Sequence, residues 1–148
     1  MPAELVARTI SSESPELVAA LLAADLPTED LGDGGRNFYA FEEAGRPIGF
    51  AGFELYGEDM LLRSVVVLPD ARGKGYGRAL TEAVLARAGE AGARRAYLLT
   101  TTAVSFFRHD GFAYIERAEA PASILATKQA TTTCSTAALL TRPILRHG

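Results

Sequence analysis

The chain has 148 residues, and it contains no tryptophan, one cysteine and two histidines. The single cysteine, Cys134, cannot form an internal disulfide bond, which is typical of a protein of the reducing cytoplasm. With so few histidine and cysteine side chains, the sequence predicts neither a structural nor a catalytic metal site. Cys134 has no histidine or other base beside it in the sequence, so we expect a small apolar filler rather than a nucleophile.

Long apolar runs and an excess of basic charge are also missing. No stretch approaches the roughly 18 consecutive apolar residues of a membrane span, and the first residues, Met1-Pro2-Ala3-Glu4, lack the pattern of a signal peptide. The net charge of −3 and a pI of about 5.4 do not favour nucleic acid as a partner. Hydrophobic residues make up 48% of the chain. We expect one domain over residues 1–148, located in the cytoplasm. We expect neither a membrane nor a nucleic acid as its partner.

The most informative segment is a glycine-rich loop between an apolar run and a helical pattern. The run ends at Pro69, and Gly73, Gly75 and Gly77 follow before the helix expected from Arg78 to Ala91. Backbone N–H groups at a helix start have no partner inside the helix and point at an incoming anion. Glycine lets the backbone approach that anion closely. We therefore expect a pyrophosphate site made of Arg72, Gly73, Lys74, Gly75, Tyr76, Gly77 and Arg78.

The spacing of this loop excludes two common phosphate loops. Lys74 is followed by Gly75 rather than serine or threonine, so the Walker pattern fails, and the third glycine comes one residue early for the dinucleotide pattern. Arg72, Gly75 and Gly77 do fit Arg-x-x-Gly-x-Gly, which resembles the acetyl-CoA loop of the GNAT superfamily of N-acetyltransferases. The plain alternative is an ordinary glycine-rich turn between a strand and a helix.

Hydrophobic periodicity predicts an alternation of strands and helices along the chain. Strands are expected at 5–10, 38–42, 47–55, 60–68, 96–101, 112–117 and 137–145, and helices at 15–24, 78–91, 103–109 and 121–130. Residues 27–35 are expected to form an acidic loop. The strand at 96–101 should lie parallel to that at 60–68. Pro143 suggests that the strand at 137–145 lies at an edge of the sheet. This order resembles the GNAT fold, an α+β (mixed α/β) class with a central mixed sheet of six to seven strands and helices on both faces.

A second motif supports the same resemblance. Residues 106–112, Phe-Phe-Arg-His-Asp-Gly-Phe, are similar to the aromatic-x-x-x-Gly-Phe segment that follows the fifth strand in the superfamily. Three short strings, at residues 62–64, 98–103 and 106–107, also resemble a small subgroup of acetyltransferases found with arsenic-resistance genes. His109 ends the expected short helix, where we expect its side chain to interact with the helix C-terminus.

The resemblance implies an acetyl-CoA-dependent N-acetyltransferase that acts on the amine of a small molecule without a metal. The backbone of Val65, Val66 and Val67 would hold the pantetheine arm like an added strand, and Phe107 would also lie at the cosubstrate. A homodimer through the last strands is compatible with such a fold. The alternative from another class is a catalytically weak acyl-CoA-binding regulatory module.

The groups that would move protons are not evident. Many superfamily members carry a tyrosine where Phe107 stands, and a phenyl ring donates no proton. The substitute donors that we consider are Ser105, Tyr97, Thr100 and a bound water. The candidate bases or ammonium-binding groups are Glu54, Glu58, Asp59, Glu29, Asp30 and Asp33, each of which could equally be a solvated surface carboxylate. Glu54, Thr100 and Ser105 are the catalytic candidates that we carry forward.

Arg63 is the candidate for binding the acceptor. Strand alternation would place its side chain on one face with Val65 and Val67. It would then either reach solvent at the end of the sheet or hold an anionic group of the substrate through two hydrogen bonds, as arginine does with carboxylates and related oxyanions.

Overall fold

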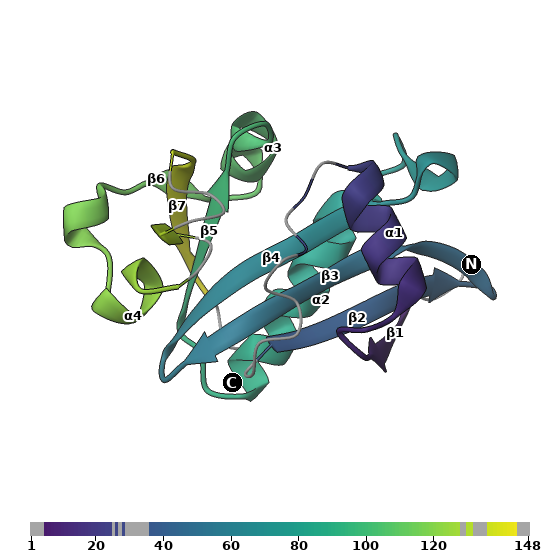
Figure 1. The fold of residues 1–148 in the computed structure, drawn as a ribbon, viewed down its shortest axis with the longest axis horizontal. Coiled ribbons are helices and arrows are strands. Elements are labelled where there is room, and N and C mark those ends of the chain that lie inside the picture. The colour runs from purple at the N-terminus through teal and green to yellow at the C-terminus, as the bar shows by residue number, and fades with distance from the viewer. Residues whose placement is uncertain are drawn as a thin grey trace. The chain divides into compact units, whose positions relative to one another are not determined.

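The computed structural model describes residues 5–24, 26, 28, 36–127, 130, 131 and 136–144. Its strands form a mixed seven-stranded sheet in the order β1-β2-β3-β4-β5-β7-β6, which confirms the predicted sheet (Figure 1). The strands are β1 (Leu5–Ile10), β2 (Arg36–Glu43), β3 (Arg46–Tyr56), β4 (Asp59–Val67), β5 (Arg95–Thr100), β6 (Ala113–Tyr114) and β7 (Ala138–Pro143). The helices are α1 (Pro15–Ala23), α2 (Tyr76–Glu90), α3 (Val104–His109) and α4 (Ala122–Leu125), with short 3-10 turns at Pro69–Ala71 and Arg117–Glu119.

The chain divides into two compact units. The first contains residues 1–54 and 64–84, and the second contains residues 55–63 and 85–148. In the part of the chain that the structure describes, no helix is long and apolar enough to cross a membrane.

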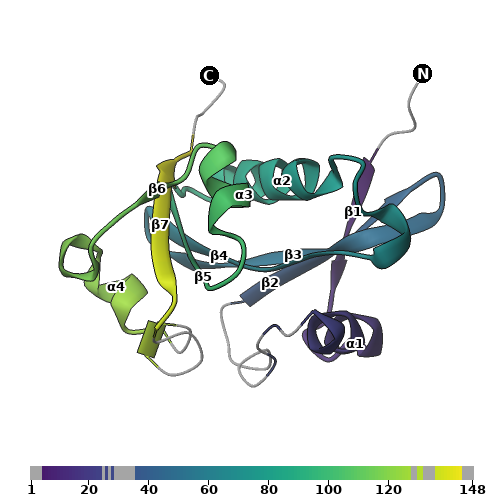
Figure 2. The same cartoon turned by 90° about the horizontal axis from the view of Figure 1, so that it is seen from above.

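The first unit is built on an antiparallel meander with helices on both faces. β1 pairs with β2, and β2 pairs with β3 around the turn at Ala44–Gly45, where both residues have a positive φ. Helix α1 begins as the sequence predicts, because Ser14 accepts a hydrogen bond from the Leu17 N–H at 3.3 Å and Pro15 holds the first helical position. Within this unit, α1 covers one face of the strands and the first turns of α2 cover the other (Figure 2).

The core of the first unit lies between α1 and the sheet. Leu17 and Leu21 of α1 are fully buried against side chains of three strands, namely Phe38, Ala40, Phe50 and Val66. On the opposite face, Tyr39 lies 6.4 Å from the rings of both Phe41 and Phe53. Alternation along β2 therefore sends one set of side chains to each helix-covered face.

Gly49 in β3 lies close to both the backbone of β4 and the Leu80 side chain of α2. A Cβ atom at this position would overlap the carbonyl oxygen of Val66 and would lie 3.0 Å from Leu80 Cδ2. Glycine is therefore required here for space, because no side chain fits between the strand and these neighbours.

The second unit contains the parallel pair of the sheet. Residues Asp59–Leu61 of β4 pair in parallel with Arg95–Tyr97 of β5, as the sequence predicts. β5 then pairs antiparallel with β7, and β7 with β6. The core of this unit consists of Leu61, Tyr97, Ile124 and Leu139.

Three of the predicted elements in the second unit are wrong in extent or place. The strand expected at 112–117 covers only Ala113–Tyr114, because the Phe112 N–H bonds to the Phe107 carbonyl and thereby ends α3. The helix expected at 121–130 is interrupted: α4 ends at Leu125, residues 126 and 127 form a turn and a bend, and residues 130 and 131 are again helical. The last strand is not at the edge: β7 lies between β5 and β6, and β6 pairs only with Leu140 and Thr141, so its ladder stops short of Pro143.

The contact at Gly49 generates a prediction about stability. Gly49→Ala should lower the free energy of unfolding by about 3 kcal/mol, because the added Cβ forces β3 away from Val66. Gly57→Ala is the control: Gly57 has φ +64 and open space around its Cβ position, so only backbone strain of about 1 kcal/mol is expected. Urea denaturation measures both, and equal losses would contradict the prediction.

Candidate functional site

The predicted phosphate loop lies between the end of β4 and the start of α2, in the first unit. After β4, the Leu68 N–H bonds to the Ile48 carbonyl at 2.8 Å, and one 3-10 turn follows. Arg72 then donates from Nε to the Val67 carbonyl at 2.9 Å, which fastens the loop to the strand that precedes it. Gly73 and Gly75 have φ values of +79° and +83°, a left-handed conformation that side chains disfavour.

The predicted phosphate loop continues into the start of α2. The helix begins at Tyr76, two residues earlier than expected, and the N–H groups of its first turn have no acceptor four residues back within the helix. Gly73, Lys74 and Gly75 are exposed beside this turn, and no atom lies within 4 Å of the Cβ positions of the two glycines. The structure thus brings residues 72–78 together as one exposed loop of amides with Lys74 and two arginines.

Tyr76 has a side-chain partner outside the loop. Its hydroxyl donates to Glu43 Oε1 at 2.7 Å. This hydrogen bond, followed by burial and the Glu43 charge, raises the pKa of Tyr76 above its ordinary value, so the hydroxyl stays protonated at neutral pH.

β4 contains a break in its alternation next to the three valines. Ser64 has φ +59°, which is rare for a residue other than glycine. Val66 is 6% exposed, whereas Val65 and Val67 are half-buried. The shared face predicted for Arg63 and the valines assumed unbroken alternation, and Ser64 interrupts it.

Arg63 is buried in the second unit, with an exposed fraction of 3%. The alternative in which it reaches solvent at the end of the sheet is therefore wrong. A buried guanidinium is costly unless anions or dipoles compensate it, so Arg63 keeps its candidacy as a group that interacts with an anion.

The candidate carboxylates differ in their surroundings. Glu54 is only 1% exposed and its Oε2 lies 3.5 Å from Nε of Arg36, its cross-strand neighbour, so it is not a solvated surface group. Glu58 is exposed and pairs with Arg94 at 3.0 Å, as a surface carboxylate would. Burial, and then the Glu58 charge, raise the pKa of Asp59. Glu29, Asp30, Asp33 and Cys134 lie outside the described residues.

The candidate proton donors lie at the end of β5 and on α3. Thr100 Oγ1 accepts a hydrogen bond from the Ala103 N–H at 3.0 Å and so supports the turn that leads into α3. Tyr97 is 4% exposed, and burial raises its pKa, with a smaller effect from the Asp59 charge. Ser105 is exposed on α3. Of these three residues, Ser105 is the exposed one, and Tyr97 is part of the buried core.

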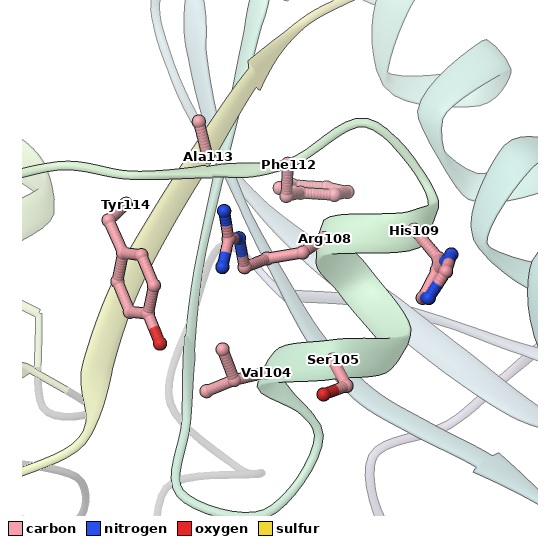
Figure 3. Close-up of a pocket in the computed structure, with 7 residues that line it drawn as sticks. All are labelled: Val104, Ser105, Arg108, His109, Phe112, Ala113 and Tyr114. Carbon is pink, nitrogen blue, oxygen red and sulfur yellow. The ribbon is translucent and has the colours of Figure 1, made fainter.

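Ser105 also lines a pocket of about 400 Å³ in the second unit (Figure 3). The residues around it are Val104, Ser105, Arg108, His109, Phe112, Ala113 and Tyr114. The Arg108 guanidinium lies 5.2 Å from the centre of the Tyr114 ring and points toward it, whereas His109 points to the other side of α3. Sequence reasoning missed Tyr114, because it assigned residues 112–117 to a longer strand.

Phe107 is part of an aromatic cluster. It is 8% exposed, and its ring meets those of Phe106 and Phe112 edge to face, at centroid distances of 4.9 and 5.6 Å. Such pairs add to stability beyond their apolar area. Among the described residues, no group of three histidine, cysteine or acidic side chains is placed to hold a metal ion.

Comparison with known proteins identifies the family. The chain belongs to the GNAT acetyltransferase family, since the model of the acetyltransferase (GNAT) domain matches residues 34–114. No curated protein sequence was found to match the chain.

Solved structures show the same fold. N-acetylglutamate synthase of Neisseria gonorrhoeae, complexed with coenzyme A and N-acetyl-glutamate, is 19% identical with a TM-score of 0.79 over 99% of this chain and 36% of its own. A GNAT acetyltransferase of Staphylococcus aureus is 18% identical (TM-score 0.75, 96% and 100% covered). The IAA acetyltransferase of Bacillus cereus is 17% identical (TM-score 0.70, 95% and 99% covered). The chain thus spans about a third of the synthase but nearly all of the other two.

The packing of Phe107 generates a prediction. Phe107→Leu should lower stability by about 1–2 kcal/mol through lost aromatic contacts, while the turnover of acetyl-CoA changes less than about threefold, because the phenyl ring moves no proton. Denaturation and steady-state kinetics measure the two effects. Phe107→Tyr serves as the counter-test: a gain in turnover of about a hundredfold would mean that a missing acid at this position limits the enzyme.

Proposed function

We propose that this GNAT domain transfers the acetyl group of acetyl-CoA to the amine of a small, amino-acid-like molecule that carries an anionic group. The observation that carries the first half is the loop Arg72–Arg78 at the start of α2, with two left-handed glycines whose Cβ positions have no atom within 4 Å. A pyrophosphate is the anion of acetyl-CoA that suits such a loop.

The fit to acetyl-CoA follows from the residues around this loop. The amides of residues 73–78 would hold the pyrophosphate, with Lys74 and Arg78 adding positive charge. The backbone of Val65, Val66 and Val67 would bind the pantetheine arm as an added strand. Phe107 would contribute apolar contact at the same cosubstrate.

The chemistry is a direct transfer between amine and thioester. The neutral amine attacks the carbonyl carbon, a C–N bond forms and the C–S bond breaks. The nitrogen gives up one proton, and the departing thiolate takes up one proton, directly or through a hydroxyl or a water. A thiol of pKa about 8.5 is a fair leaving group, so Ser105, Thr100 or water can complete the step. The contribution of Tyr97 as donor is disfavoured by its burial in the core.

The second half of the proposal, the anionic acceptor, rests on Arg63. The protein is acidic overall, with a net charge of −3, so an anionic acceptor needs a local cation, and Arg63 is a buried one. The neighbouring synthase structures contain N-acetyl-glutamate or L-arginine, which are amino-acid ligands of those proteins. Amino acids that bear a carboxylate, phosphinate or arsenic-oxyacid group are the class that we propose.

The acceptor's ammonium needs a carboxylate. Glu54, Glu58, Glu29 and Asp30 remain the proposed partners. Glu54 is already held by Arg36, so a role for it would require the substrate to share or displace that cation.

A cytoplasmic location and a homodimer through the last strands remain predictions from the sequence.

The alternative function is an acyl-CoA-binding regulatory module, which the phenyl ring at position 107 favours. Release of free CoA thiol with a panel of small amino acids, amino-phosphinates and uncharged amines separates the two functions. An enzyme releases thiol in proportion to acetylated product, whereas a binding module retains CoA and turns nothing over.

The first prediction from this proposal concerns the loop. Gly75→Val should abolish measurable CoA binding, because a branched side chain would stand where the pyrophosphate approaches and would strain a φ of +83°. Gly57→Val is the matched control: Gly57 has φ +64° and open surroundings in the β3–β4 turn, so it carries a similar strain away from the loop. Titration calorimetry that finds equal CoA affinity in the two variants would refute the site.

The second prediction concerns the acceptor. Arg63→Lys should raise the KM of an anionic amino acid about tenfold, which corresponds to about 1.4 kcal/mol, because lysine cannot form the two parallel hydrogen bonds of a guanidinium. The KM of acetyl-CoA should stay within about twofold. Efficient acetylation of uncharged amines that is indifferent to Arg63→Lys would show that the acceptor is recognised elsewhere.

A further inference from the structure

The tip of the β2–β3 hairpin contacts the phosphate loop at both of its ends, within the first unit. At the start of the loop, the Leu68 N–H donates to the Ile48 carbonyl at 2.8 Å. At its end, the Tyr76 hydroxyl donates to Glu43 at 2.7 Å. Between these two hydrogen bonds lie the residues that form the proposed pyrophosphate site.

A register shift gives the hairpin tip this geometry. Phe41 pairs with Gly49 but Glu42 pairs with Pro47, so Ile48 is the extra residue of the bulge, and its carbonyl is the one that Leu68 uses. Along β2, consecutive side chains point to opposite faces. Two neighbouring carboxylates therefore have different partners: Glu42 pairs with Arg8 of β1 at 3.2 Å, and Glu43 accepts from Tyr76.

The hydrogen bond between Tyr76 and Glu43 is of a strong kind, because a hydroxyl donates to a carboxylate at 2.7 Å. This hydrogen bond fixes the side chain of Tyr76, which is the first residue of α2.

We propose that Glu43 is a positioning residue for the pyrophosphate of acetyl-CoA and acts through Tyr76. By holding the Tyr76 side chain, it keeps the end of the loop and the first-turn amides of α2 in the binding conformation before the cosubstrate arrives. Such preorganisation strengthens binding because less ordering remains to be done. The inference rests on the proposed acetyl-CoA site.

The test compares three single variants and one double variant by CoA calorimetry. Tyr76→Phe removes the donor and should weaken CoA binding about fivefold to tenfold, whereas Glu43→Gln keeps a neutral acceptor and should weaken it less. The double variant should be no weaker than Tyr76→Phe, since both changes act on one interaction. Glu42→Gln is the matched control, with the same loss of charge at the neighbouring position, and should leave CoA affinity unchanged. Additive effects, or an equal loss in Glu42→Gln, would overturn the proposal.

A truncated substrate separates positioning of the loop from general damage. Acetyl-pantetheine has the thioester but no pyrophosphate, so Tyr76→Phe and Glu43→Gln should raise KM for acetyl-CoA while kcat/KM for acetyl-pantetheine stays unchanged. A variant that is merely less well folded would lose activity with both substrates, which would contradict the proposal.

Amide hydrogen exchange on the ligand-free protein distinguishes this inference from the proposed function. Faster exchange at residues 73–79 in Tyr76→Phe and Glu43→Gln, but not in Glu42→Gln, is the result expected of a positioning pair. If the wild-type protein bound no CoA, the proposed function would fail and the pyrophosphate role with it. If it bound CoA but exchange at the loop were unchanged in both variants, only the role of Glu43 would be refuted.

Discussion

The geometry of the phosphate loop depends on the close contact between β3 and β4 at Gly49. Because position 49 has no side chain, the backbone of β3 reaches Val66 and the Leu80 side chain of α2 at the same time. That contact fixes the end of β4 relative to the start of α2, and the loop of residues 68–75 joins two elements already held in place. A loop closed between fixed ends has little freedom left to lose when an anion binds.

Two departures from regular strand geometry occur beside the proposed site, and each changes the local direction of the backbone. The extra residue at Ile48 gives Leu68 an acceptor, and the positive φ of Ser64 reorients β4 directly before the three valines. Strain of this kind persists only where the surrounding structure holds it, which is typical of functional sites. Period-two reasoning from the sequence has no means of locating such a residue, so the face predicted for Arg63 rests on an alternation that Ser64 interrupts, while the strand itself was correct.

The sequence was informative where a local pattern determines the structure. The Ser14 cap, the Ala44–Gly45 turn, the parallel β4–β5 pair and the glycine loop all follow from neighbouring residues, and the structure has each of them. The sequence was uninformative where a residue further along the chain determines the contact. Glu54 resembles a surface carboxylate until β2 places Arg36 beside it, and Phe112 resembles a strand residue until its N–H closes α3.

This difference also explains why the cosubstrate can be inferred and the acceptor only proposed. The proposed pyrophosphate site uses backbone amides, which every sequence supplies, so the glycines and the helix start are what the sequence has to provide, and both are visible as a local spacing. Acceptor recognition uses side chains drawn from separate strands and loops, whose value depends on burial and charge compensation. Arg63 shows the consequence: its residue type is visible in the sequence, but its burial, and the interaction that it makes within the protein, come only from the fold.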